Sequence, residues 1–173
     1  MTSPTSGGFR RGVRIGVDVG SVRVGVARSD PDGMLAVPVA TLRRPAAKAA
    51  ARSDLIALVD LVAEYEPLEL VVGLPIGLDG TEGPASAAVR VYAADLVGML
   101  RARGLGVPVR LIDERMTTAE ATRGLQAAGR DSRSGRSVID QAAAVIIVQH
   151  ALDSERGTGT PPGAVLDPPE DHA

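Results

Sequence analysis

Three acidic residues that lie far apart in the sequence have the chemistry of a metal-dependent active site. They are Asp18, Glu114 and Asp140. Hard cations such as Mg²⁺ and Mn²⁺ prefer oxygen ligands, and a site for two such ions needs several carboxylates that converge. Ions held in this way neutralise the charge that develops on a phosphate group during its transfer. The three acids therefore predict a phosphodiesterase site, provided that the fold brings them together.

Each of these acids also has a purely structural interpretation. Asp18 can be a solvated residue of a surface hairpin, and Asp140 can complete a helix-capping box that begins at Ser137. Glu114 can be an exposed loop acid, and its neighbour Asp113 is an alternative candidate for the same role. Alternation along the preceding strand does not decide between the two neighbours.

Several other residues have side chains or backbone groups suited to the phosphates of a nucleic acid. Arginine forks match phosphate oxygens, and the amides of turns and helix N-termini are further donors. The candidate nucleic-acid-binding residues are Ser21, Arg23, Arg115, Thr117, Arg130, Arg133 and Arg136. The last three lie in the basic, glycine-bearing segment 129–136, which we expect to be a flexible loop that contacts a polyanion backbone. Helix capping by Thr117 and a merely solvated loop are the structural alternatives.

The hydrophobic pattern predicts the elements that must position these residues. Residues 13–30 form two predicted strands and a tight turn, because branched side chains alternate with small residues and Asp18. Glycines on both sides of Asp18 leave room around its carboxylate, which favours a prepared pocket. Residues 34–42 predict a third strand, and Pro38 places that strand at a sheet edge.

The rest of the chain alternates between helices and strands. We predict strands over 68–74 and 107–112 and helices over 45–64, 85–103, 117–128 and 137–152. Right-handed crossovers then place the two later strands parallel to the first, in a mixed sheet. Ligands gather beyond the carboxyl ends of parallel strands. We expect Asp18, Glu114 and the glycine-rich loop 73–84 at that edge.

Composition limits the possible classes of protein. The 173 residues are 45% hydrophobic, which is enough for one domain with a sizeable core. The absence of Cys excludes disulfides and thiolate metal sites, and three aromatic residues provide few stacking platforms for bases. The first eight residues lack the apolar run of a secretory signal, so we expect a cytoplasmic protein. No segment approaches the roughly 20 apolar residues that cross a bilayer, so we expect no membrane partner.

Four motifs in chain order resemble those of the YqgF/RuvX family, the Holliday-junction-resolvase-like proteins also described as pre-16S rRNA nucleases. The motifs are Gly16-Val17-Asp18-Val19-Gly20-Ser21 with Arg23-x-Gly25-Val26-Ala27, Val71-Val72-Gly73-Leu74-Pro75 with Asp79-Gly80-Thr81-Glu82, Asp113-Glu114-Arg115-x-Thr117-Thr118, and Asp140-x-x-Ala143-Ala144. Each motif alone is weak, but four in this order over residues 13–152 are specific.

The resemblance implies a ribonuclease H-like α/β fold, in which a five-stranded mixed sheet of three antiparallel strands and then parallel strands is flanked by helices. It also implies that Asp18, Glu114 and Asp140 are the catalytic and metal-binding residues of an endonuclease that uses Mg²⁺ or Mn²⁺. The implied substrate is structured RNA, the precursor of small-subunit (16S) ribosomal RNA, and the implied cut is at its 5′ end.

The expected organisation is a nuclease domain over residues 10–154 between two disordered extensions. Residues 1–9 and 155–173 are rich in small residues and proline, and the C-terminal segment is also acidic. Segments of this kind bury too little apolar surface to offset the entropy of ordering the chain.

Other functions stay open from the sequence. A Holliday-junction resolvase acting on branched DNA would use the same fold and acids, and it would be a homodimer because it cuts two strands symmetrically. A non-catalytic RNA-binding module of ribosome assembly would bind RNA but have no metal affinity. Nucleotide-binding proteins of the actin and sugar-kinase type begin with a similar hairpin, but this chain is too short to supply their second lobe.

Overall fold

The computed structural model describes residues 7–46, 49, 51–117 and 133–166, with the backbone alone for 133–139. The centre of the molecule is a sheet with the strand order β3-β2-β1-β4-β5-β6. Its strands are β1 (Arg14–Val19), β2 (Arg23–Ser29), β3 (Ala36–Arg43), β4 (Glu69–Leu74), β5 (Val109–Asp113) and β6 (Ala164–Val165). The helices in these residues are α1 (Ser53–Tyr65), α2 (Pro84–Ala102), α4 (Arg133–Thr158) and the short 3-10 helix η1 (Glu114–Met116).

Strand β1 joins the two halves of the sheet. It pairs antiparallel with β2 and parallel with β4. On one side β2 pairs antiparallel with β3, and on the other β4 pairs parallel with β5. The predicted mixed sheet, with three antiparallel strands followed by parallel strands, is therefore confirmed. The short strand β6, which the sequence did not predict, adds antiparallel to β5.

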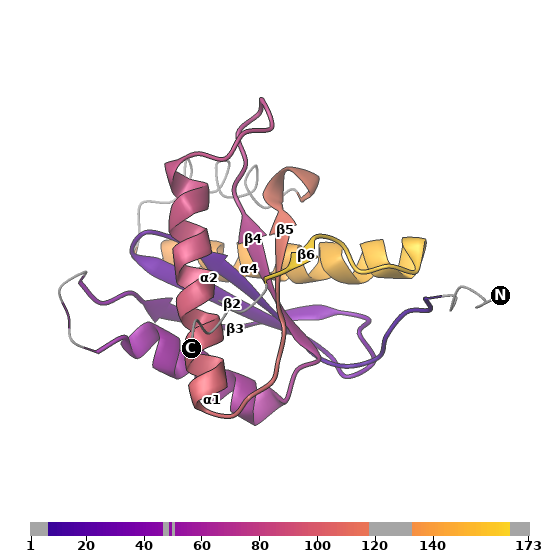
Figure 1. Ribbon diagram of the computed structural model, residues 1–173, viewed down its shortest axis with the longest axis horizontal. Coiled ribbons are helices and arrows are strands. Elements are labelled where there is room, and N and C mark those ends of the chain that lie inside the picture. Colours follow the sequence, from indigo (N-terminus) through magenta and orange to yellow (C-terminus); the bar gives the residue numbers. More distant parts are fainter. Residues whose placement is uncertain (1–6, 47–48, 50, 118–132, 167–173) are drawn as a thin grey trace, which may run out of the picture.

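Helices cover both faces of this sheet (Figure 1). Helices α1 and α2 cover the face that carries the larger core, to which Ile15, Val17, Leu70 and Val72 belong. Helix α4 crosses the other face, where Ala143 and other small side chains allow it to approach the strands. None of the helices among the described residues is long and apolar enough to span a lipid bilayer.

The first helix begins later than predicted. Helix α1 starts at Ser53, whereas the sequence predicts a helix from Pro45, and the described residues between Pro45 and Ser53 are not helical. The alanines in this stretch favour a helix, but a helix in a protein is stabilised mainly by burying an apolar face. The buried residues of this helix begin only at Asp54 and Leu55. Propensity without packing therefore did not extend the helix.

The prediction that the chain unfolds from Glu155 onward is wrong for residues 155–166. Helix α4 continues to Thr158, and the chain then returns to form β6. The Glu155 side chain is buried, and it accepts hydrogen bonds from Arg10 Nε at 2.8 Å and from Arg14 Nη2 at 2.9 Å. Composition does not reveal that residues 155–166 are ordered, because the two arginines that compensate the Glu155 charge come from a distant part of the sequence.

Candidate active site

Asp18 and Glu114 are placed on the face of the sheet that α4 covers. Side chains alternate between faces along a strand, so Asp18 shares its face with Gly16. A Cβ atom at Gly16 would lie 2.1 Å from a methyl group of Val148, so α4 packs directly on that glycine. Glu114 comes two residues after Ile112, which packs against α4. Asp18 lies near the carboxyl end of β1, and Glu114 directly follows the carboxyl end of β5. Ligands of such sheets bind beyond the carboxyl ends of the parallel strands.

Asp140 approaches Asp18 through a glycine of the neighbouring strand. In the register of β1 and β2, Asp18 lies opposite Gly25. A Cβ atom at Gly25 would lie 2.0 Å from the backbone carbonyl oxygen of Asp140, so α4 rests on bare β2 backbone at this point. A glycine in a strand commonly marks such a close approach. The fold therefore brings the segments of Asp18 and Asp140 side by side.

Glu114 lies over β4 in a similar way. Val17 of β1 pairs with Val72 of β4, so the next residue, Gly73, is level with Asp18 on the adjacent strand. A Cβ atom at Gly73 would lie 2.6 Å from Glu114 Oε1. Asp18 is 4% exposed and Glu114 is 2% exposed. Two buried carboxylates thus belong to one end of one face, with glycine backbone between them.

The structure distinguishes Glu114 from its neighbour Asp113. Strand alternation places Asp113 with Leu111, which packs toward α1 and α2. The Asp113 carboxylate accepts hydrogen bonds from the backbone N–H of Arg115 at 2.8 Å and from Arg115 Nη2 at 2.7 Å. The Arg115 side chain holds the pKa of Asp113 below its ordinary value. Asp113 therefore caps η1 and pairs with Arg115, whereas Glu114 occupies the position on the α4 face.

The carboxylate of Asp140 pairs with an arginine in this structure. Arg23 Nε donates to Asp140 Oδ2 at 2.9 Å, and the two side chains are 29% and 20% exposed. In this arrangement no three His, Asp or Glu side chains among the described residues are placed to hold a metal ion. The structure thus brings the three predicted acids to one region, but it does not show them converging on one point.

The chemistry of these donors nevertheless suits a hard divalent cation. All three groups are carboxylates, and Gly25 and Gly73 carry no side chain that would fill the space beside them. Asp18 and Glu114 are buried beside this space, and a divalent cation such as Mg²⁺ prefers carboxylate oxygens as ligands. Asp18, Glu114 and Asp140 therefore fit a Mg²⁺ or Mn²⁺ site once Asp140 turns away from Arg23.

The predicted nucleic-acid contacts have different surroundings. Ser21 is exposed in the turn between β1 and β2. Arg115 lies near the loop that follows β4, because a Cβ atom at Gly80 would be 3.5 Å from Arg115 Nη1. Thr117 Oγ1 donates to the backbone carbonyl of Glu114 at 2.9 Å. This contact is not an N-cap, in which the hydroxyl would accept from a later backbone N–H, so capping by Thr117 stays a prediction. The helix predicted from Thr117 falls on residues 118–128, outside the described part of the chain.

The basic segment is only partly described. Arg130 lies outside the described residues, whereas α4 begins at Arg133. The prediction of a loop is therefore wrong for residues 133–136, including Arg136, which are helical. Once a long helix has formed, a further turn needs no new nucleation, so its free-energy cost is small even for weak helix formers. Ser137 consequently lies inside α4, and the capping box proposed for Asp140 is wrong.

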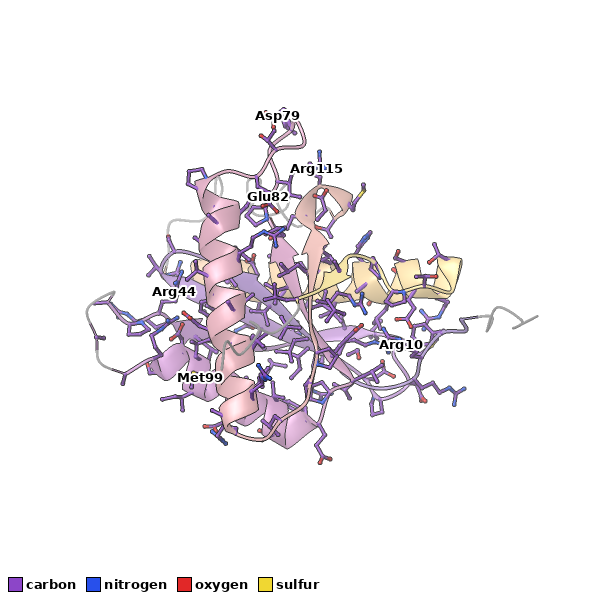
Figure 2. The ribbon with its side chains drawn as sticks, viewed as in Figure 1. Arg10, Arg44, Asp79, Glu82, Met99 and Arg115 are labelled. Carbon is purple, nitrogen blue, oxygen red and sulfur yellow. The ribbon has the colours of Figure 1, made fainter. Side chains whose placement is uncertain are left out.

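A cavity of about 500 Å³ adjoins Glu114 and was not foreseen from the sequence. Four separate segments and Glu114 line it, and they contribute Val19, Gly20, Ser21, Arg44, Pro45, Pro75, Ala85, Ala88 and Val89. Figure 2 shows Arg44 beside α2, and Asp79, Glu82 and Arg115 at the end of the molecule where the loop after β4 lies. Arg44 was not among the predicted site residues, because a single arginine after a strand belongs to no motif.

Comparisons with known proteins identify the family. The family model described as "RuvX: Holliday junction resolvase" matches residues 12–154. A Streptomyces coelicolor protein named "Putative pre-16S rRNA nuclease" is 58% identical over 156 residues, which cover 90% of this chain and 88% of that protein. A Nocardioides protein of the same name is 52% identical over 164 residues, covering 92% and 99% of the two chains.

A solved structure supports the fold assignment. The structure described as "T. thermophilus RuvC in complex with Holliday junction substrate" matches with a TM-score of 0.55 and 16% identity, over 90% of this chain and 99% of that one. At this identity the likeness bears on the fold alone, and it confirms the predicted ribonuclease H-like class. From the family match and the closely similar curated sequences together, this chain belongs to the RuvX family of nucleases.

Proposed function

We propose that this protein is a metal-dependent endonuclease that processes the 5′ end of precursor 16S rRNA in the cytoplasm. The observation that carries the proposal is the common placement of Asp18, Glu114 and Asp140 at one end of the α4 face, in a chain of the RuvX family. The names of the relatives point to pre-16S rRNA as the substrate.

In this proposal Asp18, Glu114 and Asp140 hold Mg²⁺ or Mn²⁺. The bound ion supplies Lewis-acid stabilisation of the charge on the transferring phosphoryl group. Gly25 and Gly73 keep the three carboxylates close to the sheet, because any larger residue would displace Asp140 or Glu114. The protein contributes a preorganised, largely buried set of oxygen donors.

Arginines orient the substrate in the same proposal. Arg23 compensates the charge of Asp140 in the structure, and it donates to a phosphate oxygen of the bound strand once Asp140 has turned away. An ion pair with Asp113 fixes Arg115 at the edge of the carboxylate site. In the proposal Arg115 contacts the phosphate backbone of the bound nucleic-acid strand. Ser21, Arg130, Arg133 and Arg136 add sequence-independent contacts to phosphates.

The test is an isosteric replacement of the most buried aspartate of the site. Asp18→Asn keeps the shape of the side chain and removes one anionic ligand, so we expect loss of Mn²⁺-dependent cleavage of a precursor 16S rRNA fragment with an unchanged circular dichroism spectrum. Asp32→Asn makes the same chemical change in an exposed turn and serves as the control. Cleavage by Asp18→Asn at the wild-type rate would remove the proposal.

A second candidate is cleavage of branched DNA. It is favoured by the description of the family model and by the junction bound in the RuvC structure, whose fold this chain shares. A resolvase needs two active sites related by symmetry, so the protein would be a homodimer. Assays on precursor rRNA and on a four-way junction, with the mass in solution measured by light scattering, distinguish the two. A protein that binds RNA but neither binds Mn²⁺ nor cuts either substrate would be a ribosome-assembly module without catalysis.

A further inference from the structure

We propose that the cavity beside Glu114 holds one nucleotide of the substrate strand and that Arg44 binds the phosphate of this nucleotide. The proposal rests on the proposed nuclease function, since it states where the strand lies relative to the acids. Glu114 lines one part of the cavity, and Arg44 lines another. The cavity thus joins the carboxylate region to a cationic group that no sequence motif indicated.

The Arg44 side chain is held in place before any ligand binds. Its Nη1 donates to the backbone carbonyl of Gly20 at 2.9 Å, and its guanidinium lies 5.1 Å from the ring centroid of Tyr92. Tyr92 is 1% exposed, so the ring is a fixed support for the cation. The backbone N–H of Arg44 also donates to the carbonyl of Val22 at 2.8 Å. Both ends of the residue are therefore attached to the turn between β1 and β2.

Arg44 also differs from nearby arginines in its partners among the described residues. Arg52 pairs with Asp95 at 3.1 Å, and Arg90 donates through Nε to Glu82 at 3.0 Å. None of the ion pairs between described residues includes Arg44. A preorganised guanidinium without a carboxylate partner in the described chain suits an external anion, and its planar fork matches a phosphate.

The size and walls of the cavity identify the anion as part of a nucleotide. A volume of about 500 Å³ suits a small molecule or one nucleotide, and it excludes a duplex. Aliphatic side chains form most of the wall, including Pro45, Pro75 and Val89, and they suit a sugar or a base face. A nucleotide in a strand has a phosphate on either side of its sugar. The proposal places one phosphate at Arg44 and the next toward Glu114, which lines the same cavity.

Two alanines of α2 provide a test that changes no charge. Ala88 lines the cavity, whereas Ala87 does not, and both are exposed on the same helix. Leucine is a good helix former, so Ala88→Leu and Ala87→Leu should both keep the fold. We expect Ala88→Leu to weaken binding of a fluorescein-labelled 12-nucleotide single-stranded RNA about tenfold, and Ala87→Leu to change it less than twofold, as measured by fluorescence anisotropy in EDTA at low salt.

The cation is tested with a second matched pair. Arg44→Ala removes the proposed phosphate contact, and Arg43→Ala removes the same charge from the adjacent exposed residue, which does not line the cavity. We expect about a tenfold loss of RNA affinity for Arg44→Ala, the size of one charge-assisted hydrogen bond, and a loss below threefold for Arg43→Ala.

Equal affinities within either pair, or no RNA binding by the wild-type protein, would overturn the proposal. Because these measurements are made without metal, they are independent of the cleavage assay on Asp18→Asn. Metal-dependent cleavage with equal binding by the matched variants would retain the nuclease and reject the nucleotide cavity. Selective loss of binding without any cleavage would retain the cavity and reject the nuclease.

Discussion

At the scale of single residues, Asp140 has two competing partners. Its carboxylate pairs with Arg23 in the structure, and the proposed metal requires the same carboxylate. A partly exposed ion pair contributes about 0.2–1 kcal/mol, so the competition is weak enough for a divalent ion to win. In the proposed site Arg23 would therefore lower the metal affinity without blocking metal binding.

Arg23→Ala should consequently tighten metal binding. Without the competing guanidinium, we expect the Mn²⁺ dissociation constant to fall by about two- to fivefold, which corresponds to the free energy of the ion pair. Isothermal titration calorimetry with MnCl₂ measures this constant directly. Arg43→Ala controls for the loss of one positive charge, and an Arg23→Ala constant equal to that of this control would contradict the competition.

Glu155 is a second residue whose charge has a calculable consequence. Burial acts to raise the pKa of this carboxyl, but the hydrogen bonds from Arg10 and the charges of Arg10 and Arg14 outweigh burial, and the pKa lies below its ordinary value of 4.5. The folded protein therefore binds a proton at Glu155 less readily than the unfolded chain does. Its contribution to stability is present above pH 4.5 and is lost as the pH falls through the lowered pKa.

Glu155→Gln should destabilise the protein in a pH-dependent way. The variant leaves the buried Arg14 without its anionic partner, so we expect the free energy of unfolding at pH 7 to fall by about 3 kcal/mol. Urea unfolding at pH 7 and at a series of values below 4.5 measures the difference between variant and wild type. That difference should shrink toward acid pH, and a difference independent of pH would show that Glu155 is protonated in the native state.

At the scale of elements, the approach of α4 to the sheet is fixed by glycines. A Cβ atom at Gly25 would meet the backbone of Asp140, which cannot rotate away as a side chain could. The helix itself must move to relieve such a contact. The position of Asp140 relative to Asp18 therefore depends on the absence of one side chain on β2.

Gly25→Ala should destabilise the protein and disturb the site. We expect a loss of about 1–3 kcal/mol in the free energy of unfolding, as for other overpacked contacts, together with weaker Mn²⁺ binding. Gly98→Ala is the matched control, because Gly98 lies within α2 and a Cβ atom there would meet nothing within 4 Å. The control should instead be stabilised by about 0.5–1 kcal/mol. Equal unfolding midpoints in urea for the two variants would contradict this account of the contact.

At the scale of the whole molecule, the two ends of the chain complete the fold. Arg10 donates to Glu69 of β4 at 2.9 Å as well as to Glu155, and Arg110 of β5 donates to Glu69 at 3.0 Å. The segment before β1, two parallel strands and the end of α4 thus share one ion-pair network. Beyond α4, β6 pairs with the outer edge of β5. Without β6, the unpaired backbone groups of β5 would be open to pairing with other chains.

Removal of β6 should therefore promote association. We expect a chain truncated after Thr158 to form oligomers at concentrations where the 173-residue chain does not, because the backbone edge of β5 becomes exposed. Multi-angle light scattering over a concentration series measures this. A chain truncated after Leu166 keeps β6 and is the control. Identical masses for the two truncated chains would show that β6 does not protect the edge.

The sequence by itself determined the candidate acids and the elements other than β6. Strand alternation over residues 13–30 and the glycines around Asp18 are local patterns, and a local pattern predicts which side chains share a face. The order of strands and helices then predicted the mixed sheet and placed Asp18 and Glu114 at the carboxyl ends of its strands, where the structure has them. Helix ends were less predictable, because packing decides whether a helix such as 45–64 extends over its alanine-rich start.

Only the tertiary structure decided the relations between distant segments. The position of Glu114, and not Asp113, on the α4 face followed from its proximity to Gly73, and the order at Glu155 followed from Arg10 and Arg14. The cavity of Arg44 is likewise assembled from several separate segments. Such contacts arise because burial is shared among residues from the whole chain, and no local pattern records which distant charge or glycine will be the neighbour.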